Sequence, residues 1–241
     1  MKRLALCVLL LSAVPGSVTA ADCVVLLHGL GRSSASMDTM YDALREAGFL
    51  AVNVDYPSRD YPIGKLAWMA VTEGLEGCRA MPEAAKIDFV THSLGGILVR
   101  QYLSETAIPE LGRVVMLAPP NQGSAVADEL ADMPGYDWFT GPAGKQLGKG
   151  EESVPLALGP ADFELGVIAG DRSIDPVGSA ILDDPDDGKV SVADTRLEGM
   201  EDFVVVEHSH AFIMSMDDTI ELTIRFLETG HFAEEKAAQS Q

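Results

Sequence analysis

Apolar residues along this chain gather in short unbroken runs instead of alternating with polar ones. Runs of this length are typical of parallel strands that are buried on both faces of a sheet. Six of them, rich in valine, isoleucine and leucine, occupy residues 24–27, 50–54, 87–90, 114–117, 165–169 and 203–206. We therefore predict a mostly parallel sheet of about six strands.

Several segments between these runs have apolar residues at helical spacing. We predict helices over residues 37–47, 63–80, 94–104 and 220–227. Ser33 and Ser34 are candidate caps for the first helix, and Gly48 is a typical helix stop. Because strands alternate with helices, the pattern predicts a doubly wound α/β fold.

Residues 121–162 interrupt this alternation with glycines, prolines and the isolated aromatics Tyr136, Trp138 and Phe139. We expect a long irregular insertion above the carboxyl end of the sheet, because such insertions commonly form active-site lids or binding loops. No internal repeat or low-complexity linker is visible. Residues 21–241 are therefore predicted to form a single domain.

The amino terminus has the pattern of a secretory signal peptide. Lys2 and Arg3 precede an apolar run over residues 4–11, and small residues precede the expected cleavage after Ala20. The run is shorter than the ~20 residues that span a bilayer, so a stable membrane anchor is the weaker interpretation. We expect export of the protein, to the periplasm or out of the cell.

Two cysteines, Cys23 and Cys78, remain after the signal peptide. In an oxidising compartment we predict that they form a disulfide, and the alternative is a pair of buried free thiols. The bond would close a loop that the chain-entropy model values at about 4 kcal/mol.

The chain is strongly acidic, with 37 acidic residues against 17 basic ones and a formal net charge of −20. The predicted mature chain, without Lys2 and Arg3, is more negative still. Such a surface repels nucleic acids and anionic lipid head groups. Neither is therefore an expected partner, and the oligomeric state stays open.

A candidate nucleophile follows the third apolar run, in the sequence Thr91-His92-Ser93-Leu94-Gly95-Gly96. An apolar strand, a tight turn and a helix would display the Ser93 hydroxyl beside the unpaired N–H groups of the helix. The motif is G-x-S-x-G with Thr91 in place of the first glycine, and we expect Gly95 and Gly96 to supply the missing room. The alternative is a merely tight strand-to-helix turn.

A nucleophilic serine needs a base, and two histidines follow the last apolar run. We choose His210, because it lies further from the strand end and beside the apolar residues 212–214. His208 is the second choice, and His231 is interpreted as a surface residue.

The acid that would orient this base is less well determined. Asp171 and Asp175 are nearest to the end of the fifth strand, whereas Asp187 lies in a turn followed by the apolar Val190. From these residues alone the three are comparable.

Backbone donors for an oxyanion are predicted from a second glycine-rich turn, His28-Gly29-Leu30-Gly31. The N–H of Leu30 and the N–H of Leu94 would form a two-donor oxyanion hole. His28 is expected to anchor the turn. A phosphate-binding loop is the competing interpretation, but the third glycine and a P-loop lysine are missing.

These motifs resemble the α/β-hydrolase superfamily, and more narrowly its small secreted bacterial lipase and esterase branch. The resemblance extends over nearly the whole mature chain and includes Pro119-Pro120-Asn121-Gln122-Gly123-Ser124. It implies that Asp187, in its Asp-Gly-x-Val turn, is the acid. It also implies that the first strand lies beside the nucleophile strand, with Leu30 close to Ser93 and the two cysteines at the opposite edge.

The expected activity is that of a serine hydrolase that cleaves small-molecule or lipid esters through an acyl-enzyme. Ser93 would attack, His210 would act as base and then acid, and Asp187 would orient the imidazole. No metal or organic cofactor is required, although the acidic cluster from Asp183 to Asp187 leaves a structural calcium site open. The alternatives are an acyltransferase or thioesterase with the same residues, or a non-catalytic binding protein that retains the fold.

Overall fold

Six parallel strands form one sheet in the order β2-β1-β3-β4-β5-β6. The computed structural model describes residues 21–131, 135–183 and 185–233, without the side chains of residues 131 and 136–139. The strands are β1 (Ala21–Leu27), β2 (Leu50–Val54), β3 (Ala84–His92), β4 (Leu111–Leu117), β5 (Leu165–Gly170) and β6 (Asp202–Val206). Each contains one of the predicted apolar runs, so the predicted parallel sheet is confirmed. The predicted signal peptide lies outside the described residues.

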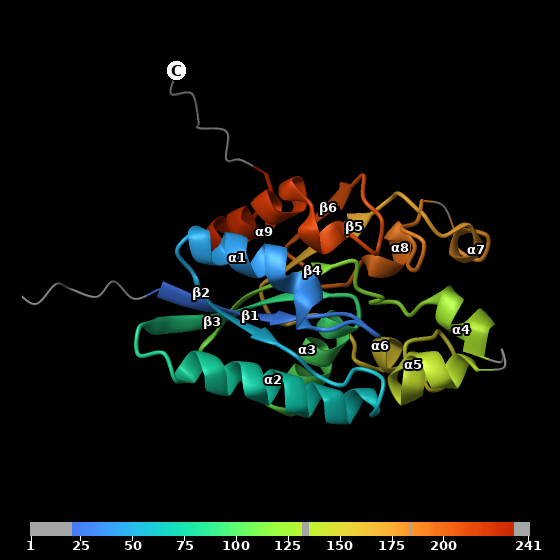
Figure 1. Cartoon of the computed structure of the whole chain (residues 1–241), viewed down its shortest axis with the longest axis horizontal. Coiled ribbons are helices and arrows are strands. Elements are labelled where there is room, and N and C mark those ends of the chain that lie inside the picture. Colours follow the sequence, from blue (N-terminus) through green and yellow to red (C-terminus); the bar gives the residue numbers. More distant parts are fainter. Residues whose placement is uncertain (1–20, 132–134, 184, 234–241) are drawn as a thin grey trace, which may run out of the picture.

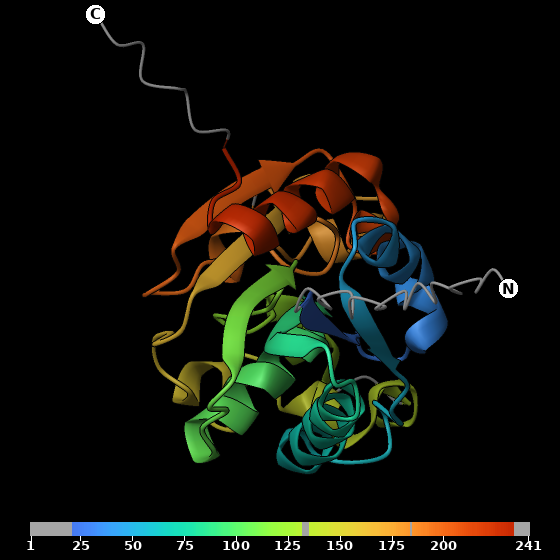
Figure 2. The ribbon, with the colours of Figure 1, turned by 90° about the vertical axis from the view of Figure 1, so that its left-hand side faces the viewer.

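Helices cover both faces of the sheet (Figures 1 and 2). One face carries α1 (Asp38–Glu46) and α9 (Asp217–Thr229), and the other carries α2 (Ile63–Arg79) and α3 (Leu94–Glu105). This arrangement confirms the doubly wound α/β fold. The first predicted helix begins with a 3₁₀ turn, η1 (Ser34–Met37), and the Ser33 side chain makes no capping hydrogen bond to it.

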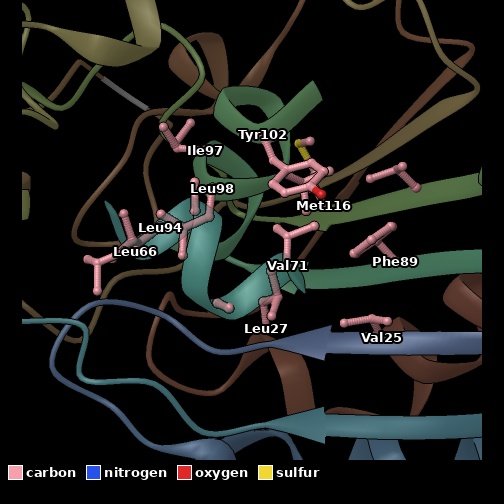
Figure 3. Close-up of a cluster of buried hydrophobic side chains, with 14 of the residues drawn as sticks. Val25, Leu27, Leu66, Val71, Phe89, Leu94, Ile97, Leu98, Tyr102 and Met116 are labelled. Carbon is pink, nitrogen blue, oxygen red and sulfur yellow. The ribbon is translucent and has the colours of Figure 1, made fainter. Parts of the chain in front are cut away.

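Two apolar cores, one on each face, explain why the strands have continuous apolar runs. Val25 and Leu27 of β1 belong to the core under α2 and α3, whereas Val24 and Leu26 belong to the core under α1 and α9. All four side chains are fully buried. Figure 3 shows the first core, where Phe89 of β3 and its strand neighbours face side chains of α2 and α3.

The segment over residues 121–162 is more regular than predicted. Its described residues include the helices α4 (Ala125–Ala131), α5 (Tyr136–Lys145) and α6 (Val154–Ala157). Gly141, with a φ of 62°, and Pro142 kink α5, so no long helical periodicity was visible in the sequence. Together with α7 (Pro176–Ser179) and α8 (Val192–Thr195), these helices lie at the carboxyl end of the strands (Figure 1).

A disulfide joins Cys23 of β1 to Cys78 in the last turn of α2, as predicted, with the two Cα atoms 5.8 Å apart. The bond ties the helix to the strand at the end of the sheet opposite the short helices. Within the three described stretches, no helix has both the length and the apolar character needed to span a membrane.

Candidate active site

Ser93 lies at the sharp corner between β3 and α3. Its φ of 52° and ψ of −118° lie in a region that non-glycine residues rarely adopt, and such strain is commonly kept at functional positions. The corner is held by the Ser93 N–H, which donates to the carbonyl of Leu117 at the end of β4 over 2.9 Å. The backbone therefore forms the tight strand-to-helix turn that was predicted from the sequence.

Two glycines after Ser93 make this corner sterically feasible. A Cβ atom on Gly95 would lie 2.6 Å from the carbonyl oxygen of Leu27, and one on Gly96 would lie 3.2 Å from the Thr91 hydroxyl. The bulkier Thr91 therefore replaces the first glycine of the motif without a clash, because Gly96 leaves room for its side chain.

A continuous hydrogen-bonded chain runs from Ser93 through His210 to Asp187. The His210 Nδ1–H donates to Asp187 Oδ2 over 2.7 Å, because a carboxylate can only accept. Nε2 is then the unprotonated nitrogen, and it accepts from the Ser93 hydroxyl over 3.0 Å. This arrangement makes the imidazole ready to remove the serine proton.

Asp187 is held rigidly in its turn. Its other carboxylate oxygen accepts from the backbone N–H groups of Lys189 at 2.9 Å and Val190 at 2.8 Å. The His210 N–H also donates to the Asp187 carbonyl over 3.0 Å. The side chain of Asp187 is fully buried, so its orientation does not depend on solvent.

The other candidate residues from the sequence are engaged elsewhere. Asp175 caps α7 and pairs with the Lys189 ammonium at 2.6 Å. Asp171 lies 3.8 Å from the Arg172 guanidinium, and His208 pairs with Asp218 at 2.6 Å. Of the proposed bases and acids, the structure brings His210 and Asp187 to Ser93.

The two predicted oxyanion donors follow the carboxyl ends of two neighbouring strands, β1 and β3. β1 pairs with β3 in a register that places Leu27 beside Thr91, so the turn after β1 reaches the serine corner. Leu94 is the first residue of α3, and its N–H has no acceptor within the helix. Leu30 lines the same cavity as Ser93. This adjacency agrees with what the resemblance implied.

His28 anchors the turn that carries Leu30. Its Nδ1–H donates to the Gly29 carbonyl over 2.8 Å, its Nε2 accepts from the Tyr56 N–H over 3.3 Å, and its ring stacks on Tyr56 at 4.0 Å. The Tyr56 hydroxyl in turn donates to the His28 carbonyl. Burial lowers the pKa of His28, which keeps the ring neutral and suits it to this structural role.

Sequence reasoning missed two residues that hold the His210 loop. His92 is buried, and its Nε2–H donates to the His210 carbonyl over 3.0 Å. Burial and the nearby His210 lower the pKa of His92 well below its usual value, so the ring stays neutral. Arg32 donates from Nη2 to the carbonyl of Ala211 over 2.8 Å. The position of His92 directly before Ser93 was the available signal, whereas nothing marked Arg32.

A cavity of about 330 Å³ opens at this site. Ser93, His210 and Leu30 line one part of it, and apolar side chains of the insertion, among them Val126 of α4 and Leu147 after α5, line another. The insertion therefore lies beside the serine hydroxyl, where it can determine which molecules reach the site.

The described residues of the acidic loop form no metal-ligand cluster. In the parts of the chain that the structure describes, no three histidine, cysteine, aspartate or glutamate side chains are grouped to hold a metal ion. The Asp186 carboxylate accepts instead from the Ser179 hydroxyl and the Gly188 N–H, both at 2.7 Å.

Comparison with curated proteins finds no match, whereas solved structures share the fold. The mature Bacillus licheniformis lipase BlEst2 aligns with 86% of this chain and 92% of its own, at 21% identity and a TM-score of 0.70. Phospholipase PlaB from Legionella pneumophila aligns with 88% of this chain but only 60% of its own, at 19% identity and a TM-score of 0.69.

A metagenomic carboxyl esterase, MGS0156, aligns with 80% of this chain and 65% of its own, at 22% identity and a TM-score of 0.59. At such identities the likeness shows the fold alone, and that fold agrees with the resemblance read from the motifs. A family model described as the alpha/beta hydrolase family matches residues 24–237. The chain therefore belongs to the alpha/beta hydrolase family.

Proposed function

We propose that this protein is a serine hydrolase that cleaves carboxylic esters, with Ser93, His210 and Asp187 as its catalytic triad. The observation that carries the proposal is the unbroken hydrogen-bonded chain of these three residues at the edge of a mainly apolar cavity. Serine, imidazole and carboxylate in this relation generate a nucleophile at neutral pH without a metal.

In the first half of the reaction, Ser93 Oγ attacks the carbonyl carbon of the ester while its proton moves to His210 Nε2. Asp187 stabilises the resulting imidazolium through the Nδ1 hydrogen bond. The N–H groups of Leu30 and Leu94 donate to the oxyanion, and each such donor typically contributes about 3 kcal/mol to the transition state. Collapse of the intermediate expels the alcohol, which takes the proton from Nε2.

In the second half, water replaces the alcohol. His210 Nε2 removes a proton from the water as it attacks the acyl-enzyme, and the released Ser93 Oγ takes that proton back when the carboxylic acid leaves. Nε2 must therefore face both the serine and the solvent-accessible cavity. His210 is half-buried and lines that cavity, which meets this requirement.

The size of the cavity supports esters of modest length. Its volume lies near the lower end of the roughly 300–1,000 Å³ that is usual for ligand pockets. Lining residues such as Leu30, Val126 and Leu147 favour an apolar acyl group. The similar structures are those of a lipase, a phospholipase and a carboxyl esterase, which supports an ester substrate.

We further propose that the protein is exported as a single alpha/beta hydrolase domain with residues 121–162 as a covering insertion. The disulfide between Cys23 and Cys78 supports this location, because such bonds persist in oxidising compartments. The signal-peptide pattern of residues 1–20 supports it independently.

The test is hydrolysis of p-nitrophenyl esters of increasing acyl length by the purified mature protein. Ser93→Ala and His210→Gln should each lower kcat at least a thousandfold, whereas His208→Gln, the matched control outside the hydrogen-bonded chain, should stay within about threefold. We expect the optimum at short to medium acyl chains. Absence of turnover on every ester by folded protein would refute the proposal and favour acyl transfer or a binding role.

A further inference from the structure

One cationic side chain in the catalytic cavity has no carboxylate partner among the residues that the structure describes. The charged side chains that line this cavity are Arg32, Lys189, Asp175 and Asp187. Lys189 pairs with Asp175 at 2.6 Å, and Asp187 is bound to His210. Arg32 forms no ion pair with any residue that the structure describes, although the chain carries a net charge of −20. Among the described residues, no carboxylate in the site therefore balances the charge of Arg32.

Arg32 is also held in place beside the reacting groups. It follows the oxyanion turn, two residues after Leu30. Its Nη2 donates over 2.8 Å to the carbonyl of Ala211, the residue next to His210. The guanidinium is thus fixed between the turn that supplies an oxyanion donor and the loop that supplies the base.

Most of the N–H donors of this guanidinium have no acceptor among the described residues. Arginine has five N–H donors in a planar fork, and the bond to Ala211 occupies one of them. The residue is half-buried, and desolvation lowers its pKa without an acidic neighbour to offset it. A partly desolvated cation with free donors is stabilised by an anion, and carboxylate and phosphate oxygens match the spacing of the fork.

We propose that Arg32 determines substrate specificity by binding an anionic group, a carboxylate or a phosphate, that the ester carries close to the scissile bond. The inference rests on the proposed ester hydrolysis and names the substrate class of that site. The other charged side chains of the cavity are paired, Lys189 with Asp175 and Asp187 with His210, so the anionic group would be recognised at the side of the oxyanion turn. Neutral esters would be hydrolysed without this contact.

Two matched substrate pairs test the proposal. On the acyl side, p-nitrophenyl hexanoate is compared with the mono-p-nitrophenyl ester of adipic acid, which adds a terminal carboxylate. On the alcohol side, the butyryl ester of glycerol is compared with the butyryl ester of glycerol phosphate. The ratio of kcat/KM for the anionic member to that for the neutral member is measured for each pair, so that effects on catalysis itself cancel.

Arg32→Gln should lower this ratio by about tenfold or more in at least one pair, which is the expected loss of a charge-assisted hydrogen bond. The pair that responds shows whether the anionic group is on the acyl or the alcohol side. Arg32→Lys, which keeps the charge but not the planar fork, should restore part of the ratio. Lys86→Gln, at the amino end of β3, removes an equal charge outside the cavity and should leave the ratio unchanged.

An unchanged ratio in both pairs after Arg32→Gln would overturn the inference. An equal fall in kcat/KM for both members would overturn it too, because Arg32 would then act only as a support for the Ala211 loop. Calorimetric titration of the anionic member of each pair onto Ser93→Ala separates this inference from the proposed hydrolysis. Binding of either ligand that weakens about tenfold in Ser93→Ala/Arg32→Gln would support the anion site even if no ester were turned over, and equal binding of both ligands by the two variants would refute it.

Discussion

Asp88 is a buried carboxyl group on β3 whose titration should control the pH dependence of stability. It is 2% exposed, and Oδ1 accepts from the Arg113 N–H over 2.6 Å, while Oδ2 has no hydrogen-bond partner among the described residues. The bond is possible because residue 112 is a glycine: a Cβ atom at this position would lie only 2.0 Å from Asp88 Oδ1. Burial, with a smaller contribution from the nearby Asp22 carboxylate, raises the pKa of Asp88 to about 7.

The sign of the effect follows from the two protonation states. The pKa of Asp88 is 3.8 in the unfolded reference and about 7 in the fold, so between these values the folded state binds more protons. The free energy of unfolding therefore falls as the pH rises through this range, and the loss is complete above pH ~8. The difference between the two pKa values corresponds to about 4 kcal/mol.

The perturbation is Asp88→Asn, which keeps the acceptor for the Arg113 N–H but cannot ionise. Urea unfolding of both proteins at a series of pH values should give similar stabilities near pH 4 and a growing advantage of the variant up to pH 8, approaching about 4 kcal/mol. Asp42→Asn, on the exposed side of α1, controls for the loss of one negative charge. A difference between Asp88→Asn and the wild type that does not change with pH would refute the reasoning.

Three further predictions concern the disulfide, the His210 loop and the serine corner. Replacing Cys23 and Cys78 together by alanine should cost about 4 kcal/mol of unfolding free energy, because their separation of 55 residues closes a long loop in the unfolded chain; urea titration measures this, and equal stability of the double variant would contradict it. His92→Phe removes the donor to the His210 carbonyl, so kcat for the best ester should fall about tenfold with KM nearly constant; a change confined to KM would speak against a positioning role. Gly95→Ala should destabilise the protein by about 1–3 kcal/mol, because its Cβ would press on a strand carbonyl; a wild-type melting temperature would show that the corner relaxes.

Several features of the fold followed from local patterns. Each predicted strand could be recognised because both of its faces are buried. Val24 and Val25, for example, point into the cores on opposite faces of the sheet, so the run contains no polar residues. The corner at Ser93 was visible because a strand, a tight turn and a helix leave adjacent signals in the chain. The insertion was less predictable, since α5 is short and kinked at Gly141, and its periodicity is broken within a few residues.

The sequence by itself determined the sheet, the serine corner and the pairing of Cys23 with Cys78. The tertiary structure decided which carboxylate accepts the hydrogen bond from the base. Asp171 and Asp175 lie closer in sequence to the end of the fifth strand, but Asp187 is the residue whose carboxylate is oriented toward His210 by backbone donors in its own turn. It also decided that Arg32 lines the cavity without an ion-pair partner among the described residues. Local sequence patterns indicate which residues of a segment are buried. The contacts of Asp187 and Arg32, however, join loops that follow different strands, so they form only when the sheet brings the strand ends together.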